Sequence, residues 1–151
     1  MSDLLEVNHL QKYFHTKSGT LHAVENVSFQ LEEGKTLGVV GESGCGKSTL
    51  LSIIAGLLAP ETGTIVVNNP DGSLHYPRVG YMLQHDHLFE WRTIYQNVTL
   101  GLEIHHALTK ERTDYVKQLL SDYGLESFQD KRPSELSGGM KQRAALIRTL
   151  A

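Results

Sequence analysis

Residues 41–48 read Gly-Glu-Ser-Gly-Cys-Gly-Lys-Ser, which matches the pattern G-x-x-x-x-G-K-[ST]. In this pattern the glycines let the backbone approach a polyphosphate, and successive backbone N–H groups point toward it. Residues 36–40 predict an apolar strand before the motif, and residues 48–57 predict a helix after it. A strand, a glycine-rich loop and a helix N-terminus in this order favour anion binding. We therefore interpret the motif as a phosphate-binding loop and not as a chance turn.

Three side chains of this loop have separate expected roles. Lys47 is expected to reach the β- and γ-phosphates of a nucleotide, and the hydroxyl of Ser48 is expected to bind Mg²⁺. Cys45 is the only cysteine and lies close to Lys47 at a predicted helix N-terminus. A nearby ammonium group and a helix dipole both lower the pKa of a thiol. We therefore predict that Cys45 is reactive, and a buried, inert cysteine is the alternative.

A second motif, at residues 136–143, reads Leu-Ser-Gly-Gly-Met-Lys-Gln-Arg. Ser137 is a favourable N-cap, and residues 140–148 favour a helix. This predicts a second helix N-terminus, preceded by paired glycines, that could also face an anion. Taken together, the two motifs resemble those of the ATP-binding-cassette (ABC) ATPases, in which this signature motif is as specific as the phosphate-binding loop.

The resemblance covers nearly the whole chain and implies a set of site residues. The residues implied to bind ATP in the loop are Gly41, Glu42, Ser43, Gly44, Cys45, Gly46, Lys47, Ser48 and Thr49. Phe14 resembles the aromatic residue that stacks on adenine, with Tyr13 as the alternative. Gln84 matches the Q-loop glutamine, so Ser48 and Gln84 are the implied Mg²⁺ ligands.

The family pattern also implies a partner ATPase, because two subunits of such proteins enclose two ATP molecules. The signature residues would close on the γ-phosphate held by a second ABC ATPase subunit, giving a homodimer. These signature residues are Leu136, Ser137, Gly138, Gly139 and Met140.

Residues 88–92, Leu-Phe-Glu-Trp-Arg, follow Gln84 and suggest a second kind of partner. Exposed aromatic side chains here could dock another protein, and core packing of Trp91 is the alternative. In the family this segment faces transmembrane permease subunits. The stretch most resembles the nitrate, sulfonate and taurine import branch, although that branch often has proline where this chain has Glu90. The resemblance implies a cytoplasmic subunit on the inner face of the membrane, linked indirectly to an extracytoplasmic solute-binding protein.

Composition excludes several other classes of protein. The formal net charge is −3, which argues against a nucleic-acid binder driven by bulk charge. The first residues lack the pattern of a secretion signal, and no apolar stretch is long enough to span a bilayer. A single cysteine fits a reducing compartment.

His85 and His87 have the closest approach to metal-ligand spacing, but we interpret them as exposed loop histidines.

The order of patterns predicts an α/β fold. The resemblance implies a P-loop core of the ABC type with an N-terminal antiparallel β subdomain and a helical subdomain, and with its C-terminal part missing. Residues 4–9, 21–31, 64–68 and 78–83 predict strands, and residues 69–72 predict a turn. Residues 93–102 and 109–123 predict helices, joined to the signature helix by a polar connector at 127–134. We expect a β-rich and P-loop part over about 1–84, a Q-loop and helical subdomain over about 85–135, and the signature helix at 136–151.

The family pattern continues beyond the signature helix with an apolar strand that ends in Asp-Glu, and residues 1–151 contain no such stretch. We therefore interpret the chain as the N-terminal part of an ABC transporter ATP-binding subunit, truncated before the Walker B strand and unable to hydrolyse ATP. The alternatives are an ABC ATPase outside transport and a nucleotide-binding module without turnover.

Overall fold

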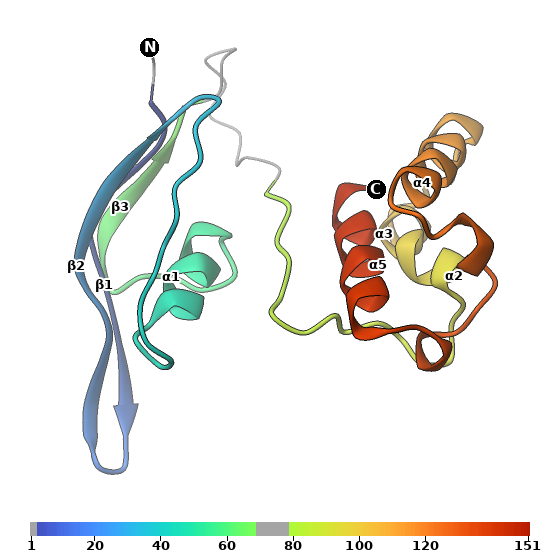
Figure 1. Cartoon of the computed structure of the whole chain (residues 1–151). Coiled ribbons are helices and arrows are strands. Elements are labelled where there is room, and N and C mark those ends of the chain that lie inside the picture. Colours follow the sequence, from blue (N-terminus) through green and yellow to red (C-terminus); the bar gives the residue numbers. More distant parts are fainter. Residues whose placement is uncertain (1–2, 69–78) are drawn as a thin grey trace. The chain divides into compact units, whose positions relative to one another are not determined.

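The computed structural model describes residues 3–68 and 79–151, and the chain forms two compact units, Met1–Val79 and Gly80–Ala151 (Figure 1). The turn predicted at 69–72 and the first residue of the strand predicted at 78–83 lie outside the described residues. The predicted division at residues 84 and 135 stays a prediction.

The first unit contains a three-stranded antiparallel sheet in the order β2-β1-β3. β1 (Asp3–Thr16) and β2 (Gly19–Glu32) form a long hairpin, and β3 (Thr62–Val67) pairs with the first part of β1. At the hairpin turn the Thr16 hydroxyl donates to the Gly19 carbonyl at 2.7 Å. The strands predicted at 4–9, 21–31 and 64–68 are therefore confirmed, with β1 extending further than predicted.

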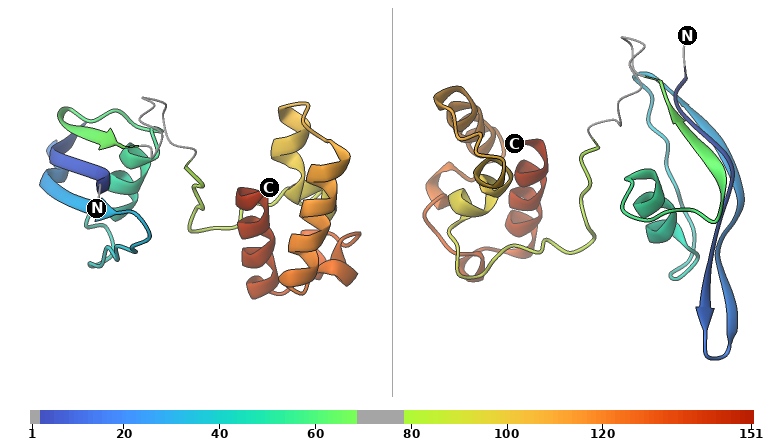
Figure 2. Two further views of the ribbon diagram at one scale, coloured as in Figure 1. Left: turned by 90° about the horizontal axis from the view of Figure 1, so that it is seen from above. Right: turned by 180° about the vertical axis from the view of Figure 1, so that it is seen from behind.

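Helix α1 (Lys47–Ile54) packs against one face of this sheet (Figures 1 and 2). Its apolar positions recur at helical spacing, so Leu50 and Ile53 face the strands together. The buried cluster that joins helix and sheet consists of Val7, Leu10, Val24, Leu50 and Ile53. This packing fixes the start of α1, where the phosphate-binding loop ends.

The strands predicted at 36–40 and 78–83 are wrong for the residues that the structure describes. Residues 36–40 and 79–83 have no strand conformation, and several of their apolar side chains are exposed, Val40 to 94%. A buried parallel strand needs neighbouring strands to accept its backbone hydrogen bonds. Among the described residues no strand pairs with either stretch. The apolar pattern alone was therefore not sufficient to make a strand.

The second unit is helical: α2 (Ile94–Val98), α3 (Leu100–Ile104), α4 (Lys110–Asp122), η1 (Glu126–Phe128), η2 (Pro133–Glu135) and α5 (Gly138–Leu150). Helices α2, α4 and α5 enclose a core in which Ile94, Val98, Val116 and Ile147 are fully buried. Among the described residues, no helix is both long and apolar enough to cross a membrane.

Local side chains explain where these helices begin. Thr93 caps α2 in a capping box with Gln96, and Thr109 caps α4 by accepting from the Arg112 N–H. The helix predicted over 93–102 is divided in two at Thr99, whose hydroxyl donates to the Tyr95 carbonyl at 2.8 Å. The connector predicted at 127–134 contains parts of η1 and η2 and is not wholly irregular.

Candidate nucleotide and partner sites

The surrounding fold leaves no room for a side chain at one glycine of the phosphate-binding loop. Gly46 is the N-cap of α1 with φ 91°, a left-handed conformation that side chains rarely adopt. A Cβ at Gly46 would lie 1.9 Å from the Ala23 carbonyl oxygen of β2. Gly44 also has a positive φ of 83°. The strand behind the loop therefore excludes any side chain at the point where helix α1 begins.

Lys47 folds back over the loop that precedes it. Its Nζ donates to the carbonyl of Gly41 at 2.8 Å and to the carbonyl of Glu42 at 2.7 Å. The Cys45 Sγ lies 3.3 Å from the same ammonium group. Two neutral carbonyls hold this charge in an exposed loop, and an anionic group at the loop would attract it more strongly. The lysine is thus placed to move from the carbonyls to a phosphate.

Cys45 is exposed, so the alternative of a buried cysteine is wrong. The hydrogen bond from Lys47 is the main cause that lowers the pKa of the Cys45 thiol, and the ammonium charge adds to it. A lower pKa raises the share of thiolate at neutral pH. The reactivity of Cys45 stays a prediction.

The remaining loop residues fit a magnesium–nucleotide group. Ser48 is exposed in the first turn of α1, where its hydroxyl oxygen is a suitable ligand for Mg²⁺. Thr49 is half-buried, and residues 41–45 are exposed. An exposed run of backbone amides, a hydroxyl and a lysine is a donor set that suits a polyphosphate with its metal ion.

The two aromatic candidates for adenine stacking have different surroundings on β1. The ring of Tyr13 packs on His22 with centroids 4.3 Å apart. The Phe14 side chain is exposed, and the Lys12 ammonium lies 5.6 Å from its ring centroid. An exposed ring has a face available for stacking, so the geometry favours Phe14. Its role in adenine binding stays a proposal.

The signature motif begins α5 as predicted. The Ser137 hydroxyl accepts a hydrogen bond from the Met140 N–H at 3.4 Å, which makes Ser137 the N-cap. Leu136 is buried and Met140 packs against the helical core, whereas Ser137, Gly138 and Gly139 are exposed. Apart from its chain neighbours and the backbone of its own helix, a Cβ at Gly138 or Gly139 would meet no atom of the described residues within 4 Å. The fold of this chain therefore leaves the glycine backbone uncovered.

The Q-loop is held by the signature helix through two residues that the sequence did not indicate. The Gln142 side chain donates to the Gln84 carbonyl at 3.3 Å. Arg148 donates to the carbonyls of Asp86 and His87, at 2.7 and 2.8 Å. The Gln84 side chain itself is exposed. Helix α5 thus connects the backbone of the Q-loop to the signature motif.

The aromatic segment after the Q-loop exposes its tryptophan. Trp91 is 71% exposed, so the core-packing alternative is wrong, and its ring lies 4.8 Å from that of Phe89 between centroids. Leu88, by contrast, is buried in the helical core. Beside this segment lies an open groove of about 600 Å³, whose lining includes Trp91, Arg92, Tyr95, Gln96, Glu103 and Leu108.

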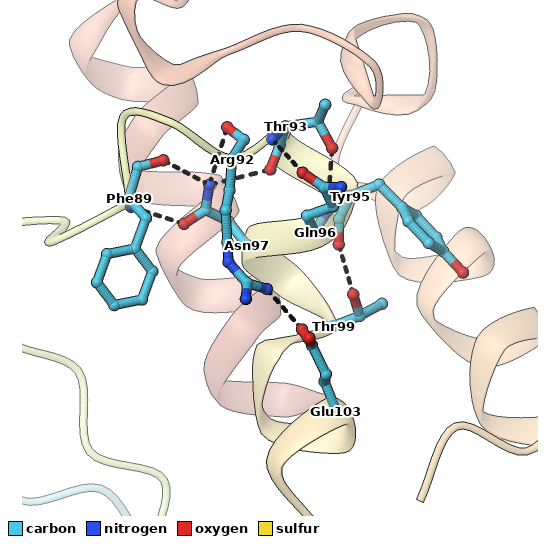
Figure 3. Close-up of polar contacts among 8 residues, drawn as sticks. All are labelled: Phe89, Arg92, Thr93, Tyr95, Gln96, Asn97, Thr99 and Glu103. Carbon is cyan, nitrogen blue, oxygen red and sulfur yellow. Dashed lines mark hydrogen bonds and ion pairs between the residues drawn. The ribbon is translucent and has the colours of Figure 1, made fainter. Parts of the chain in front are cut away.

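Polar side chains contact one another and the backbone of residues 89–93 beside the groove (Figure 3). Arg92 pairs with Glu103, and this hydrogen bond lowers the pKa of the Glu103 carboxyl. The carboxamide of Asn97, which the sequence analysis did not single out, contacts the backbone of Phe89, Arg92 and Thr93. Such contacts depend on tertiary folding and leave no periodic signal in the sequence.

His85 and His87 are exposed, with ring centroids 5.9 Å apart. In the described part of the chain, no group of three or more histidine, cysteine and acidic side chains is arranged to hold a metal ion. Ser48 belongs to the first unit and Gln84 to the second. Their joint role toward Mg²⁺ therefore stays a proposal.

Comparison with known proteins agrees with this geometry. The sequence pattern of the ABC transporter family matches residues 24–151. An ABC transporter ATP-binding protein of Bacillus subtilis, YtlC, is 47% identical over 148 residues, which cover 97% of this chain and 56% of the relative. The nitrate import ATP-binding protein NrtD of Synechocystis is 43% identical over 147 residues, covering 97% of this chain and 55% of that protein. Relatives named as aliphatic sulfonate and taurine import ATP-binding proteins also match.

Among solved structures, the ATP-binding cassette MJ0796 bound to ADP and Pi superposes with a TM-score of 0.81 at 29% identity. The match covers 97% of this chain and 69% of that one. The class defined by fold and motifs is thus the α/β P-loop ATPase core with an antiparallel β subdomain and a helical subdomain. The chain belongs to the ABC transporter family, as an ATP-binding domain. It spans slightly more than half the length of the curated relatives described above.

Proposed function

We propose that the chain is the ATP-binding part of a subunit that drives solute import through a membrane permease. The observation that carries the proposal is the exposed phosphate-binding loop at the start of α1, with the Lys47 ammonium held by two loop carbonyls and the Cys45 sulfur and by no acidic side chain among the described residues. The names of relatives, which include nitrate, aliphatic sulfonate and taurine import, support the import branch. The alternative is an ABC ATPase that does not act in transport. That alternative does not explain why Trp91 is exposed.

The loop would bind the phosphates of ATP through its own backbone. The amides of residues 41–46 would donate to phosphate oxygens, and the Lys47 ammonium would leave its two carbonyls for the β- and γ-phosphates. Ser48 and Gln84 would hold Mg²⁺, which when bound supplies positive charge against the phosphate oxygens. Phe14 would stack on the adenine ring.

A second copy of the subunit would complete the nucleotide site. Ser137, Gly138 and Gly139 are exposed at the N-terminus of α5, where backbone N–H groups favour a negative charge. They would close on the γ-phosphate of the ATP bound by the other subunit, while Leu136 and Met140 anchor the motif in the helical core. Closure on ATP and opening after hydrolysis would be passed to the permease through the segment at 85–92.

The protein would then lie on the cytoplasmic side, at the inner face of the membrane, bound peripherally to the permease subunits. An extracytoplasmic solute-binding protein would deliver the solute to the permease and meet this chain only indirectly. No nucleic-acid partner is proposed, because the net charge of the chain is −3.

We infer that residues 1–151 alone bind ATP without turnover. The sequence contains no apolar strand followed by Asp-Glu, the pattern that supplies a carboxylate for Mg²⁺ and another for the attacking water. Steady release of phosphate by the purified chain, abolished in Lys47→Ala, would contradict this inference.

Calorimetry of Mg-ATP binding tests the proposal itself. Lys47→Ala removes the charge that would contact the phosphates and should weaken binding by roughly 1.5–3 kcal/mol, the value of a charge-assisted hydrogen bond. Lys35→Ala is the matched control, since Lys35 is an exposed lysine outside the loop. Equal affinities of the wild type and Lys47→Ala would refute the nucleotide site.

A further inference from the structure

One fully buried polar side chain in the second unit has contacts that no nucleotide role explains. Asn97 lies in α2 with 0% of its surface exposed. Among the described residues, Thr99 is the only other buried polar side chain, and its hydroxyl donates to the Tyr95 carbonyl of α2. Burying a carboxamide is costly unless its donors and acceptor find partners, so its contacts show what it stabilises.

Asn97 bonds to a backbone segment outside its helix on both of its polar atoms (Figure 3). Its Oδ1 accepts from the Phe89 N–H at 2.7 Å, and its Nδ2 donates to the Phe89 carbonyl at 3.1 Å. The same Nδ2 also lies 3.3 Å from the Arg92 carbonyl and 2.9 Å from that of Thr93. The side chain thus pairs with Phe89 as a neighbouring strand would, although no strand is there.

The segment that Asn97 holds is the turn at residues 89–92. Within that turn, one backbone hydrogen bond runs from the Arg92 N–H to the Phe89 carbonyl at 3.1 Å. Helix α2 is itself tied down, because the N–H groups of Ile94 and Tyr95 donate to the carbonyls of Lys131 and Gln129, each at 2.8 Å. A fixed helix therefore positions a turn that carries the exposed Trp91.

We propose that Asn97 is a positioning residue, which holds the 89–92 turn in the conformation that presents Phe89 and Trp91 to the permease. The functional half of this proposal rests on the partner docking proposed above. A turn that is ordered before it meets a partner loses less conformational entropy on binding. An aromatic pair on such a turn is the kind of rigid anchor that dominates protein interfaces.

The contacts also explain why asparagine is required at this position. In aspartate an oxygen atom would replace Nδ2 and face the carbonyls of Phe89, Arg92 and Thr93, to which it cannot donate. Leucine, which has the same side-chain branching but no polar atoms, would leave the Phe89 N–H without its partner. Alanine would remove both groups, and we expect it to release the turn while α2 stays in place through Ile94 and Val98, which are fully buried.

Hydrogen exchange and fluorescence of the full 151-residue chain test the structural half. In Asn97→Ala the Phe89 amide should exchange roughly tenfold faster or more, since an unpaired buried group shifts such an equilibrium by about that factor. The steady-state anisotropy of Trp91, the only tryptophan in the sequence, should fall. Thr99→Val is the matched control, because it removes a buried hydrogen bond of the same region without touching the turn.

Asn97→Ala and Thr99→Val are compared at temperatures where equal fractions of each are folded. A change in Phe89 exchange and in Trp91 anisotropy for Asn97→Ala alone supports the proposal. The same change in both variants, or no change in Asn97→Ala, overturns it.

Copurification with the permease subunits, coexpressed in membranes, tests the functional half. Trp91→Ala and Asn97→Ala should both lower the amount of bound ATPase, and Thr99→Val should not. If Trp91→Ala binds like the wild type, the docking proposal fails and the functional half of this inference fails with it. If Trp91→Ala loses binding while Asn97→Ala matches Thr99→Val, docking stands and positioning by Asn97 is overturned.

Discussion

Two helices of this protein begin next to glycines, and the two sets of glycines are there for different reasons. At α1, the backbone of Gly46 is left-handed and the Ala23 carbonyl excludes a side chain. At α5, apart from chain neighbours and the backbone of their own helix, Gly138 and Gly139 have no atom of the described chain near the place a Cβ would take. The first glycine is required by the fold of its own unit. The described fold places no such requirement on the second pair, whose proposed role is toward the nucleotide held by a partner subunit.

Gly46→Ala is the substitution with the largest expected effect. A non-glycine residue in a left-handed conformation costs roughly 1–3 kcal/mol, and the clash with the β2 backbone adds to that cost. We expect the first unit to lose its cooperative thermal transition, measured by circular dichroism. A Gly46→Ala protein that melts like the wild type would mean that the loop does not need its left-handed start.

A second test concerns how each site holds its loop. Lys47 contacts its own loop, whereas Arg148 of α5 reaches the carbonyls of Asp86 and His87 in the Q-loop. Arg148→Ala leaves these two carbonyls without their donor and should lower the free energy of unfolding by about 1–3 kcal/mol. Urea denaturation measures this, with Arg143→Ala, an exposed arginine of the same helix, as the control. Equal losses in the two variants would show that Arg148 does not hold the Q-loop.

Cys45 gives a chemical test of the first loop. N-ethylmaleimide should label it and block ATP binding, and Mg-ATP should protect it, while Cys45→Ser should bind ATP and resist the reagent. Because the Lys47 hydrogen bond lowers the thiol pKa, the pH midpoint of labelling should move upward in Lys47→Ala. Mass spectrometry of the adduct measures both effects. Equal labelling rates with and without saturating ATP would place Cys45 outside the nucleotide site.

The smallest expected change in stability is a gain and not a loss. Gly139 lies in the first turn of α5, and alanine is the better helix former by about 0.5–1 kcal/mol, so Gly139→Ala should leave stability unchanged or slightly raised. The same change should weaken ATP-dependent dimerisation, measured by light scattering of the full-length subunit. A destabilised Gly139→Ala would show that this glycine also serves its own fold.

The sequence predicted the parts of this protein whose signals are local. The phosphate-binding loop, the Ser137 cap and helix α4 follow from residue types at fixed spacing, and the structure has each of them. The strand predicted at residues 36–40 did not form, because a β-strand needs a neighbouring strand to pair with. The sequence of the stretch does not specify that neighbour. Whether Trp91 is exposed or buried also depended on tertiary packing.

Asn97 and Arg148 were missed for a related reason. A single polar residue inside a helical pattern looks the same whether it faces solvent or bonds to a distant backbone. Only the folded chain shows that Asn97 pairs with Phe89 and that Arg148 bonds to the Q-loop. The roles of the nucleotide-binding residues were not observable in either way, and they stay proposals until binding is measured.

The long β1–β2 hairpin has a consequence for how the protein behaves at high concentration. Among the described residues, β1 pairs only with β2 beyond Gln11, so no described strand pairs with its other edge over residues 12–16. Lys17 lies just beyond that edge strand, and the charge of an exposed lysine discourages edge-to-edge association between molecules. Residues 36–40, Thr-Leu-Gly-Val-Val, are exposed and carry no such charge. Self-association should therefore begin at this uncharged stretch, and one lysine placed there should do more for solubility than any change to the hairpin.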